Sequence, residues 1–131
     1  MAREYSISGS VVTVTGDPFE EGKDDFLEFD LVDENGDAIE DAAVSAVTAT
    51  HRSLDTGAIV NGRDSQAVMD ANGGTLTDGT FRLDLTGDGD LLSVGSRLIQ
   101  SRELTIGVTH SAGKYMPIVA RFEVRTFRDV V

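Results

Sequence analysis

Hydrophobic and polar residues alternate with a period of two along much of the chain. The clearest case is 26–32, where leucine or phenylalanine recurs at every second position with acidic residues between them. The same alternation recurs in 81–85 and in 104–108. Successive side chains of a β-strand point to opposite faces, so this spacing predicts strands with one buried face. Further strands are predicted at 5–15, 43–51, 58–60, 66–69 and 115–127.

Short segments rich in glycine, aspartate and asparagine separate the predicted strands. In 33–37 an Asn-Gly pair supplies the positive φ angles of a tight hairpin turn. Residues 91–98 are ambiguous and include at most one helical turn. Seven or eight short strands without a convincing helix predict an all-β fold, an antiparallel β-sandwich. We expect residues 1–18 to form an N-terminal strand or arm and 19–131 to form the sandwich domain.

The predicted sandwich buries the apolar face of each alternating strand. A shift of one residue in a strand would expose all of its predicted core residues, so their burial is a direct test of this prediction. The predicted core residues are Leu27, Phe29, Leu31, Phe81, Leu83, Leu85, Leu104, Ile106, Val108, Phe122 and Val124.

The 131-residue chain is strongly acidic, with a net charge of -12 from 23 acidic and 11 basic residues. Phosphate contacts need clustered basic side chains, so this charge argues against nucleic-acid binding. Salt screens self-repulsion, and 15 aspartates beside only 2 lysines fit adaptation to high salt. An arginine-favouring, GC-rich genome with an ordinary acidic protein explains the same composition equally well.

The charge is unevenly placed, and the sequence lacks several chemical signals. Residues 1–40 carry a net charge of -10, and residues 97–131 carry +3. These segments could attract each other between copies or neutralise each other within one fold. There is no cysteine, which excludes disulfides and thiolate chemistry. Neither a membrane span nor a signal peptide is visible in the sequence.

One acidic turn begins like the calcium loop of an EF-hand. Asp33, Asn35 and Asp37 occupy alternate positions, as the first ligands of that loop do. The pattern then fails, because Ala38 stands where the loop has glycine and Val44 stands where it has a bidentate glutamate. A solvated hairpin turn is the favoured interpretation, and calcium binding is the alternative.

A second acidic cluster and two histidines complete the candidate chemistry. Asp84, Asp88 and Asp90 are separated by glycines and could offer hard oxygen ligands to Ca²⁺, although acidic loops are expected on an acidic protein. His51 and His110 lie near predicted strand ends without the ligand spacing of a metal site. No nucleophile elbow or phosphate-binding loop accompanies them. We therefore predict no catalytic residues and no cofactor.

Four segments of the chain share turn and strand motifs with a known family: 19–39, 56–60, 78–81 and 121–124. Together they resemble the Ig-like virion domains of tailed phages, notably the N-terminal domain of upper baseplate proteins. Those domains open with a Gly-Asp turn, an alternating strand and an Asp-x-x-Gly turn; here Lys23 is inserted into the first turn. The resemblance covers residues 19–125 and rests mostly on turns and strands.

The resemblance implies an Ig-like sandwich that serves as a non-enzymatic building block of a tailed virus particle. Its position would be capsid decoration, a head–tail or neck connector, or a tail adaptor. Its partners would be copies of itself and capsid, portal or tail proteins, with neither nucleic acid nor membrane. The particle would assemble in the host cytoplasm, and the composition would suggest a halophilic host. The alternative is a cell-surface Ig-like module that binds carbohydrate or protein, and a small enzyme is the third option.

The closing segment is the predicted interface. Arg121, Arg125 and Arg128 form a basic strip, and Phe127 adds apolar contact beside it. Segment 1–15 could lie along the sheet edge of a neighbouring copy, because strand addition needs little side-chain specificity. Alternatively, it is the first strand of its own sandwich.

Overall fold

A computed structural model describes residues 4–8, 11–15, 18–33, 37–91, 99–111 and 113–125. Within these ranges the chain forms ten strands and one short 3₁₀ turn, which confirms the all-β prediction. The elements are β1 (Glu4–Ser8), β2 (Val11–Thr15), β3 (Phe19–Glu20), β4 (Asp25–Asp30), η1 (Asp41–Ala43), β5 (Val44–Ser53), β6 (Gln66–Ala67), β7 (Gly74–Thr77), β8 (Thr80–Leu85), β9 (Ile99–His110) and β10 (Lys114–Arg125).

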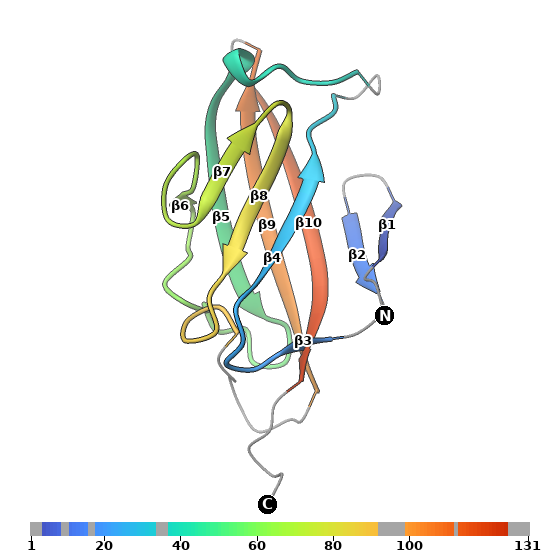
Figure 1. Ribbon diagram of the computed structural model, residues 1–131, viewed down its shortest axis with the longest axis vertical. Coiled ribbons are helices and arrows are strands. Elements are labelled where there is room, and N and C mark those ends of the chain that lie inside the picture. The colour runs from blue at the N-terminus through green and yellow to red at the C-terminus, as the bar shows by residue number, and fades with distance from the viewer. Residues whose placement is uncertain are drawn as a thin grey trace, which may run out of the picture.

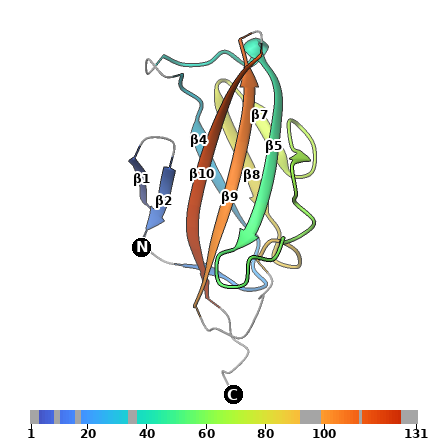
Figure 2. The same cartoon turned by 180° about the vertical axis from the view of Figure 1, so that it is seen from behind.

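The strands form two sheets that lie one over the other (Figure 1). The larger sheet has the order β1-β2-β10-β9-β5-β6, and β3 also pairs with β10. The smaller sheet has the order β4-β8-β7 and lies in front of the larger one in Figure 1. Figure 2 shows the opposite side, where β5, β9 and β10 face the viewer. The arrangement is a two-layered, β-sandwich-like fold.

The core lies between the two sheets, and both contribute to it. Ten of the eleven predicted core residues are buried, and the remaining one, Phe29, is partly buried against them. Phe19 joins the core from β3, where its ring meets that of Phe122 edge to face at 5.0 Å between centroids. The alternation therefore placed the correct face of each strand inward.

The structure corrects the predicted pairing of the N-terminal segment. The predicted strand 5–15 is instead an antiparallel hairpin, in which β1 pairs with β2. The larger sheet is mixed rather than antiparallel, since β2 and β3 both run parallel to β10. The hairpin thus lies on the edge of its own sheet, where Val11 to Thr13 pair with Val119 to Arg121.

Other elements differ in extent from the prediction. The predicted strand at 58–60 is reduced to one bridge between Arg52 and Ile59. The glycine-rich segment 72–74 runs directly into β7, an edge strand that the sequence pattern did not indicate. The turn at 33–37 closes as expected at its base, where the Asp33 amide donates to the Asp37 carbonyl at 2.8 Å. Its tip, 34–36, lies outside the described residues.

Candidate functional site

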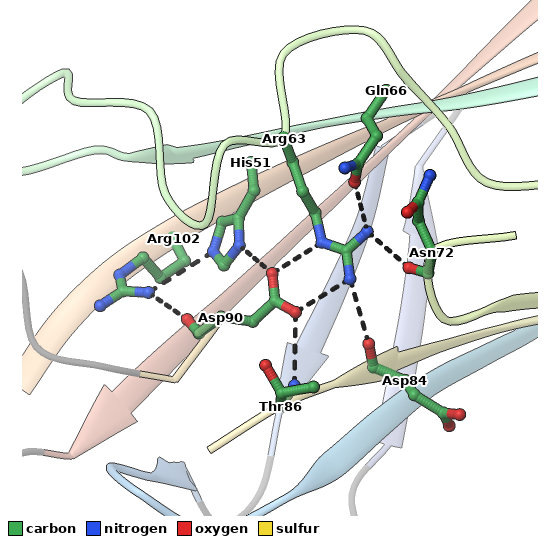
Figure 3. A network of polar contacts seen from close by, with 8 residues as sticks. All are labelled: His51, Arg63, Gln66, Asn72, Asp84, Thr86, Asp90 and Arg102. Atoms are coloured by element: carbon green, nitrogen blue, oxygen red, sulfur yellow. Dashed lines mark hydrogen bonds and ion pairs between the residues drawn. The ribbon is translucent and has the colours of Figure 1, made fainter. Parts of the chain in front are cut away.

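The most distinctive feature of the interior is a cluster of charged side chains between the two sheets (Figure 3). His51 lies on β5, Arg102 lies on β9, and Arg63 and Asp90 lie on connecting segments. His51, Asp90 and Arg102 are fully buried, and Arg63 is 3% exposed. Ionised side chains are rarely buried to this extent unless they are paired. We call these four residues the buried network.

Asp90 and Arg63 form the central ion pair of the buried network. Arg63 Nε donates to Asp90 Oδ1 at 2.8 Å, and Arg63 Nη2 donates to Asp90 Oδ2 at 3.0 Å. The planar guanidinium therefore binds both carboxylate oxygens at once, which is the strongest geometry for such a pair. The Thr86 amide also lies 3.3 Å from Asp90 Oδ2. Asp90 is thus held by donors on both of its oxygens.

His51 connects Asp90 to the second arginine. The imidazole Nδ1 lies 3.0 Å from Asp90 Oδ1, and Nε2 lies 3.5 Å from Arg102 Nη1. An ionised carboxylate only accepts hydrogen bonds, so Nδ1 carries the imidazole proton and Nε2 presents its lone pair to the guanidinium. Arg102 Nη1 also donates to the Asp90 carbonyl at 2.7 Å, and Nη2 donates to Gln100 Oε1 at 3.1 Å.

The buried network joins the two sheets. Arg63 donates from Nη1 to Gln66 Oε1 at 2.9 Å and to the Asn72 carbonyl at 3.0 Å. Its Nη2 also lies 3.4 Å from the Asp84 carbonyl on β8 of the smaller sheet. His51 and Arg102 belong to the larger sheet. Asp90 and Arg63 therefore connect segments that are distant in sequence at one end of the sandwich.

Burial and pairing shift the ionisation of the network in opposite directions. Burial lowers the pKa of His51 from its ordinary value of 6.5, although its hydrogen bond to Asp90 opposes the shift. Burial also raises the pKa of Asp90, but hydrogen bonds from His51 and Arg63 outweigh it and bring this pKa to about 2. Burial lowers the pKa of Arg102, an effect that the charge of Asp90 opposes. At neutral pH the network therefore holds a neutral imidazole, one carboxylate and two guanidinium groups.

This geometry suits a structural role rather than catalysis. A histidine paired with an aspartate forms part of a hydrolase triad, but there Nε2 faces a nucleophilic hydroxyl. Here Nε2 faces Arg102, and the imidazole is fully buried. All four side chains of the buried network are at most 3% exposed. The polar contacts instead fix the segment around Asp90 against β5 and β9.

The carboxylates of the second acidic cluster, Asp84, Asp88 and Asp90, do not point toward a common site. The carboxylate of Asp84 is exposed and accepts from Arg82 Nε at 2.9 Å. Asp88 is exposed as well, whereas Asp90 turns inward to the cations of the buried network. Within the described ranges, no group of three or more His, Asp or Glu side chains could hold a metal ion. A carboxylate already bound to a guanidinium is a poor cation ligand, so the geometry favours the structural role for Asp90.

The calcium-like turn is held by its own first residue. Asp33 Oδ1 accepts from the Asp37 amide at 3.0 Å, which is the hydrogen bonding of an ordinary polar turn. The Asp37 side chain is exposed. Asn35 lies outside the described residues, so calcium binding at this turn stays a prediction.

The predicted interface strip lies only partly in the described structure. Arg121 and Arg125 point outward from β10 and are exposed. Arg121 Nε donates to Glu103 Oε2 on the adjacent strand at 3.1 Å, so part of its charge is neutralised within its own chain. Phe127 and Arg128 lie outside the described residues. The role of this strip in assembly stays a prediction.

Sequence reasoning missed two of the four residues of the buried network, Arg63 and Arg102. The other two were singled out for different roles, Asp90 as a calcium ligand and His51 as a metal ligand or base. A signal existed for Arg102, because the inward positions of β9 continue backwards from Leu104 with the same period of two. Arg63 lies in a loop, where periodicity carries no information. Its role depends on Asp90, which is 27 residues away in sequence.

Comparisons with known proteins identify no relative. No family model matches the chain, and neither a curated protein nor a solved structure matches it. The helical part of the described chain is limited to the three residues of η1, so it contains no helix that could span a membrane. Function must therefore be argued from the structure itself and from the resemblance in the sequence.

The net charge leads to a prediction about salt. We expect the thermal midpoint to rise by about 5 °C or more between dilute buffer and molar KCl, which corresponds to roughly 1–2 kcal/mol for a domain of this size. Screening should relieve the mutual repulsion of a chain with a charge of -12. Melts in NaCl at equal ionic strength provide the control, because screening does not depend on the cation. A midpoint that stays constant or falls with salt would contradict adaptation to a salty environment.

Proposed function

We propose that this chain is an Ig-like, non-enzymatic structural subunit of a tailed virus particle and that it works through protein–protein contacts. The observation that carries the Ig-like part is the strand order. An Ig domain has strands B, E and D in one sheet and strands C, F and G in the other, with C′ beside C in the variable type. The orders β4-β8-β7 and β10-β9-β5-β6 correspond to B-E-D and G-F-C-C′.

One departure from the Ig pattern bears on assembly. The first strand of an Ig domain lies beside strand B, which corresponds to β4 here. In this chain β3 and the β1–β2 hairpin lie instead along β10, on the larger sheet. Within the described residues, β4 pairs on one side only, with β8. A sheet edge of this kind is where strands of other chains can add.

The chemistry of the described residues supports a structural role. The cluster that most resembles a catalytic pair, His51 and Asp90, is buried and bound to two arginines. Folds of this kind host many functions, so the virion assignment itself rests on the resemblance of residues 19–125.

The test follows a tagged chain in the cells that carry its gene. We expect the tag to migrate with density-purified virus particles at a constant number of copies per particle. Arg125→Glu should reduce its incorporation, because β10 would lose an exposed cation of the proposed interface. Arg82→Glu, on the outer face of the smaller sheet, is the matched control and should be incorporated normally. Recovery of the tag solely with the cell envelope would favour a cell-surface binding module and contradict the proposal.

A further inference from the structure

The outer face of the larger sheet contains a block without any charged residue. Three strands, β5, β9 and β10, contribute to it at the end nearest the β9–β10 turn, and Figure 2 views this side of the sheet. The pairing register aligns their outward positions in three rows. We call these nine residues the uncharged block: Ala46, Thr109 and Tyr115; Thr48, Gly107 and Pro117; Thr50, Thr105 and Val119.

Tyr115 gives the uncharged block an aromatic side chain that lies against the sheet. A Cβ atom added to Gly107 would lie 2.5 Å from the Tyr115 hydroxyl oxygen and 2.8 Å from its Cε1. The ring therefore occupies the space that the glycine leaves empty, over the middle strand. It remains 62% exposed, the largest exposure among the large hydrophobic side chains of the described residues. A large aromatic group at low conformational cost is typical of interface cores.

The uncharged block contrasts with the outer face of the smaller sheet. There Glu28, Asp30 and Asp84 point outward with one base, Arg82. On a chain with a net charge of -12, three consecutive rows without a carboxylate are a marked departure from the other outer face. Depletion of charge at the centre of a surface, rather than its overall hydrophobicity, is what distinguishes the core of an interface.

The row next to the uncharged block carries both signs of charge. Arg52, Glu103 and Arg121 are aligned across the three strands, and Arg121 is paired with Glu103. A patch that packs on its own copy must contain its own complement. Arginines and a glutamate beside an uncharged centre meet this condition, whereas a wholly acidic surface would repel its copy.

We propose that the uncharged block is the centre of a homodimer interface, in which a second copy of this chain packs its larger sheet face to face on the first. This inference rests on the proposed assembly role and names one partner in it. The block spans three strands and five residues along each, roughly 240 Å² of sheet by standard strand spacings. A stable interface buries about 800 Å² on each partner, so the contact must extend well beyond the uncharged block, beginning with the row of Arg52, Glu103 and Arg121.

The experiment measures the mass of the purified chain by sedimentation equilibrium in molar KCl, over roughly 1 µM to 1 mM. We expect the mass to rise with concentration from 14.0 kDa towards twice that value. Thr105→Glu places a carboxylate on the middle strand of the uncharged block in both copies. It should weaken association by at least about tenfold, because like charges would face each other across a desolvated contact.

Thr75→Glu is the matched control, since Thr75 points outward from β7 on the smaller sheet. It should dimerise as the wild type does. Tyr115→Ser is a second variant at an exposed position, and it should also weaken association while the far-ultraviolet circular dichroism stays unchanged. A wild-type chain that stays monomeric over the whole range, or a Thr105→Glu chain that dimerises as tightly as wild type, would overturn the inference.

The outcomes also separate this inference from the proposed function. A chain that is monomeric in solution but enters virus particles would overturn the homodimer and leave the virion role supported. A chain that dimerises through the uncharged block but never enters particles would support the homodimer and contradict the virion role.

Discussion

Replacing Asp90 by asparagine is expected to lower the free energy of unfolding by about 3–5 kcal/mol. The substitution keeps the size of the side chain but removes its negative charge. Arg63 then remains as a buried cation that has lost the carboxylate bound by its Nε and Nη2, and Arg102 loses the favourable charge of Asp90 while keeping its hydrogen bond to the backbone carbonyl. An uncompensated buried charge is costly, whereas the intact pair is close to neutral in its contribution. Since small domains unfold with about 5–15 kcal/mol, this loss would remove a large share of the stability.

Urea unfolding in molar KCl, followed by circular dichroism, measures the difference. Asp88→Asn is the matched control, because Asp88 is exposed in the same loop and its loss should change the stability by less than about 0.5 kcal/mol. The same midpoint for Asp90→Asn and Asp88→Asn would show that the arginines relax into solvent and that the buried network does not hold the sheets together.

A double substitution tests whether uncompensated charge is the cause. Arg63→Met removes one of the two buried cations and leaves an apolar chain of similar length. In the Asp90→Asn background it should recover part of the lost stability, although Arg63→Met alone should destabilise. Such non-additivity is expected of groups within one network. Purely additive losses would attribute the effect to packing instead.

The sequence predicted the fold correctly where the pattern within a single strand specifies which of its faces is buried. In 26–32 and 104–108 the alternation alone specifies the inward face, and the structure buries those positions, Phe29 in part. Pairing between distant segments was not predictable in this way. The parallel register of β10 with β2 and β3 joins the two ends of the chain, and no local pattern records it. The antiparallel prediction failed for that reason.

The contacts of the buried network could not be predicted for the same reason, because they join side chains that are distant in sequence. Asp90 was noticed because of its acidic neighbours, yet its environment is set by residues 27 and 39 positions away. A charged residue at an inward position of a strand, such as Arg102, indicates that a buried partner exists. It does not indicate which residue that partner is; here Arg102 donates to the backbone carbonyl of Asp90 and to Gln100 Oε1. The partners become known only from the folded structure, which brings residues distant in sequence together.

Acid should destabilise the protein through His51 before its carboxylates titrate. The folded state lowers the pKa of His51, so the unfolded chain binds a proton near pH 6.5 while the folded chain resists it. Burial disfavours the charged imidazolium and is the main cause of this resistance, and protonation would also place an N–H of Nε2 against the guanidinium of Arg102. Stability from this residue is therefore full above pH 6.5 and falls as the pH drops below it. Asp90, with a pKa of about 2, adds a later loss as the pH falls through the range between 3.8 and that value.

We expect the free energy of unfolding of the wild type to fall by about 1 kcal/mol between pH 7.5 and 5.5, since one proton changes it by at most about 1.4 kcal/mol per pH unit. Ordinary carboxylates titrate below this window, so the slope isolates the histidine. His51→Gln should be less stable than wild type at pH 7.5 but nearly flat across the window. An unchanged slope in His51→Gln would mean that the imidazole is protonated inside the fold, beside Asp90 and despite Arg102.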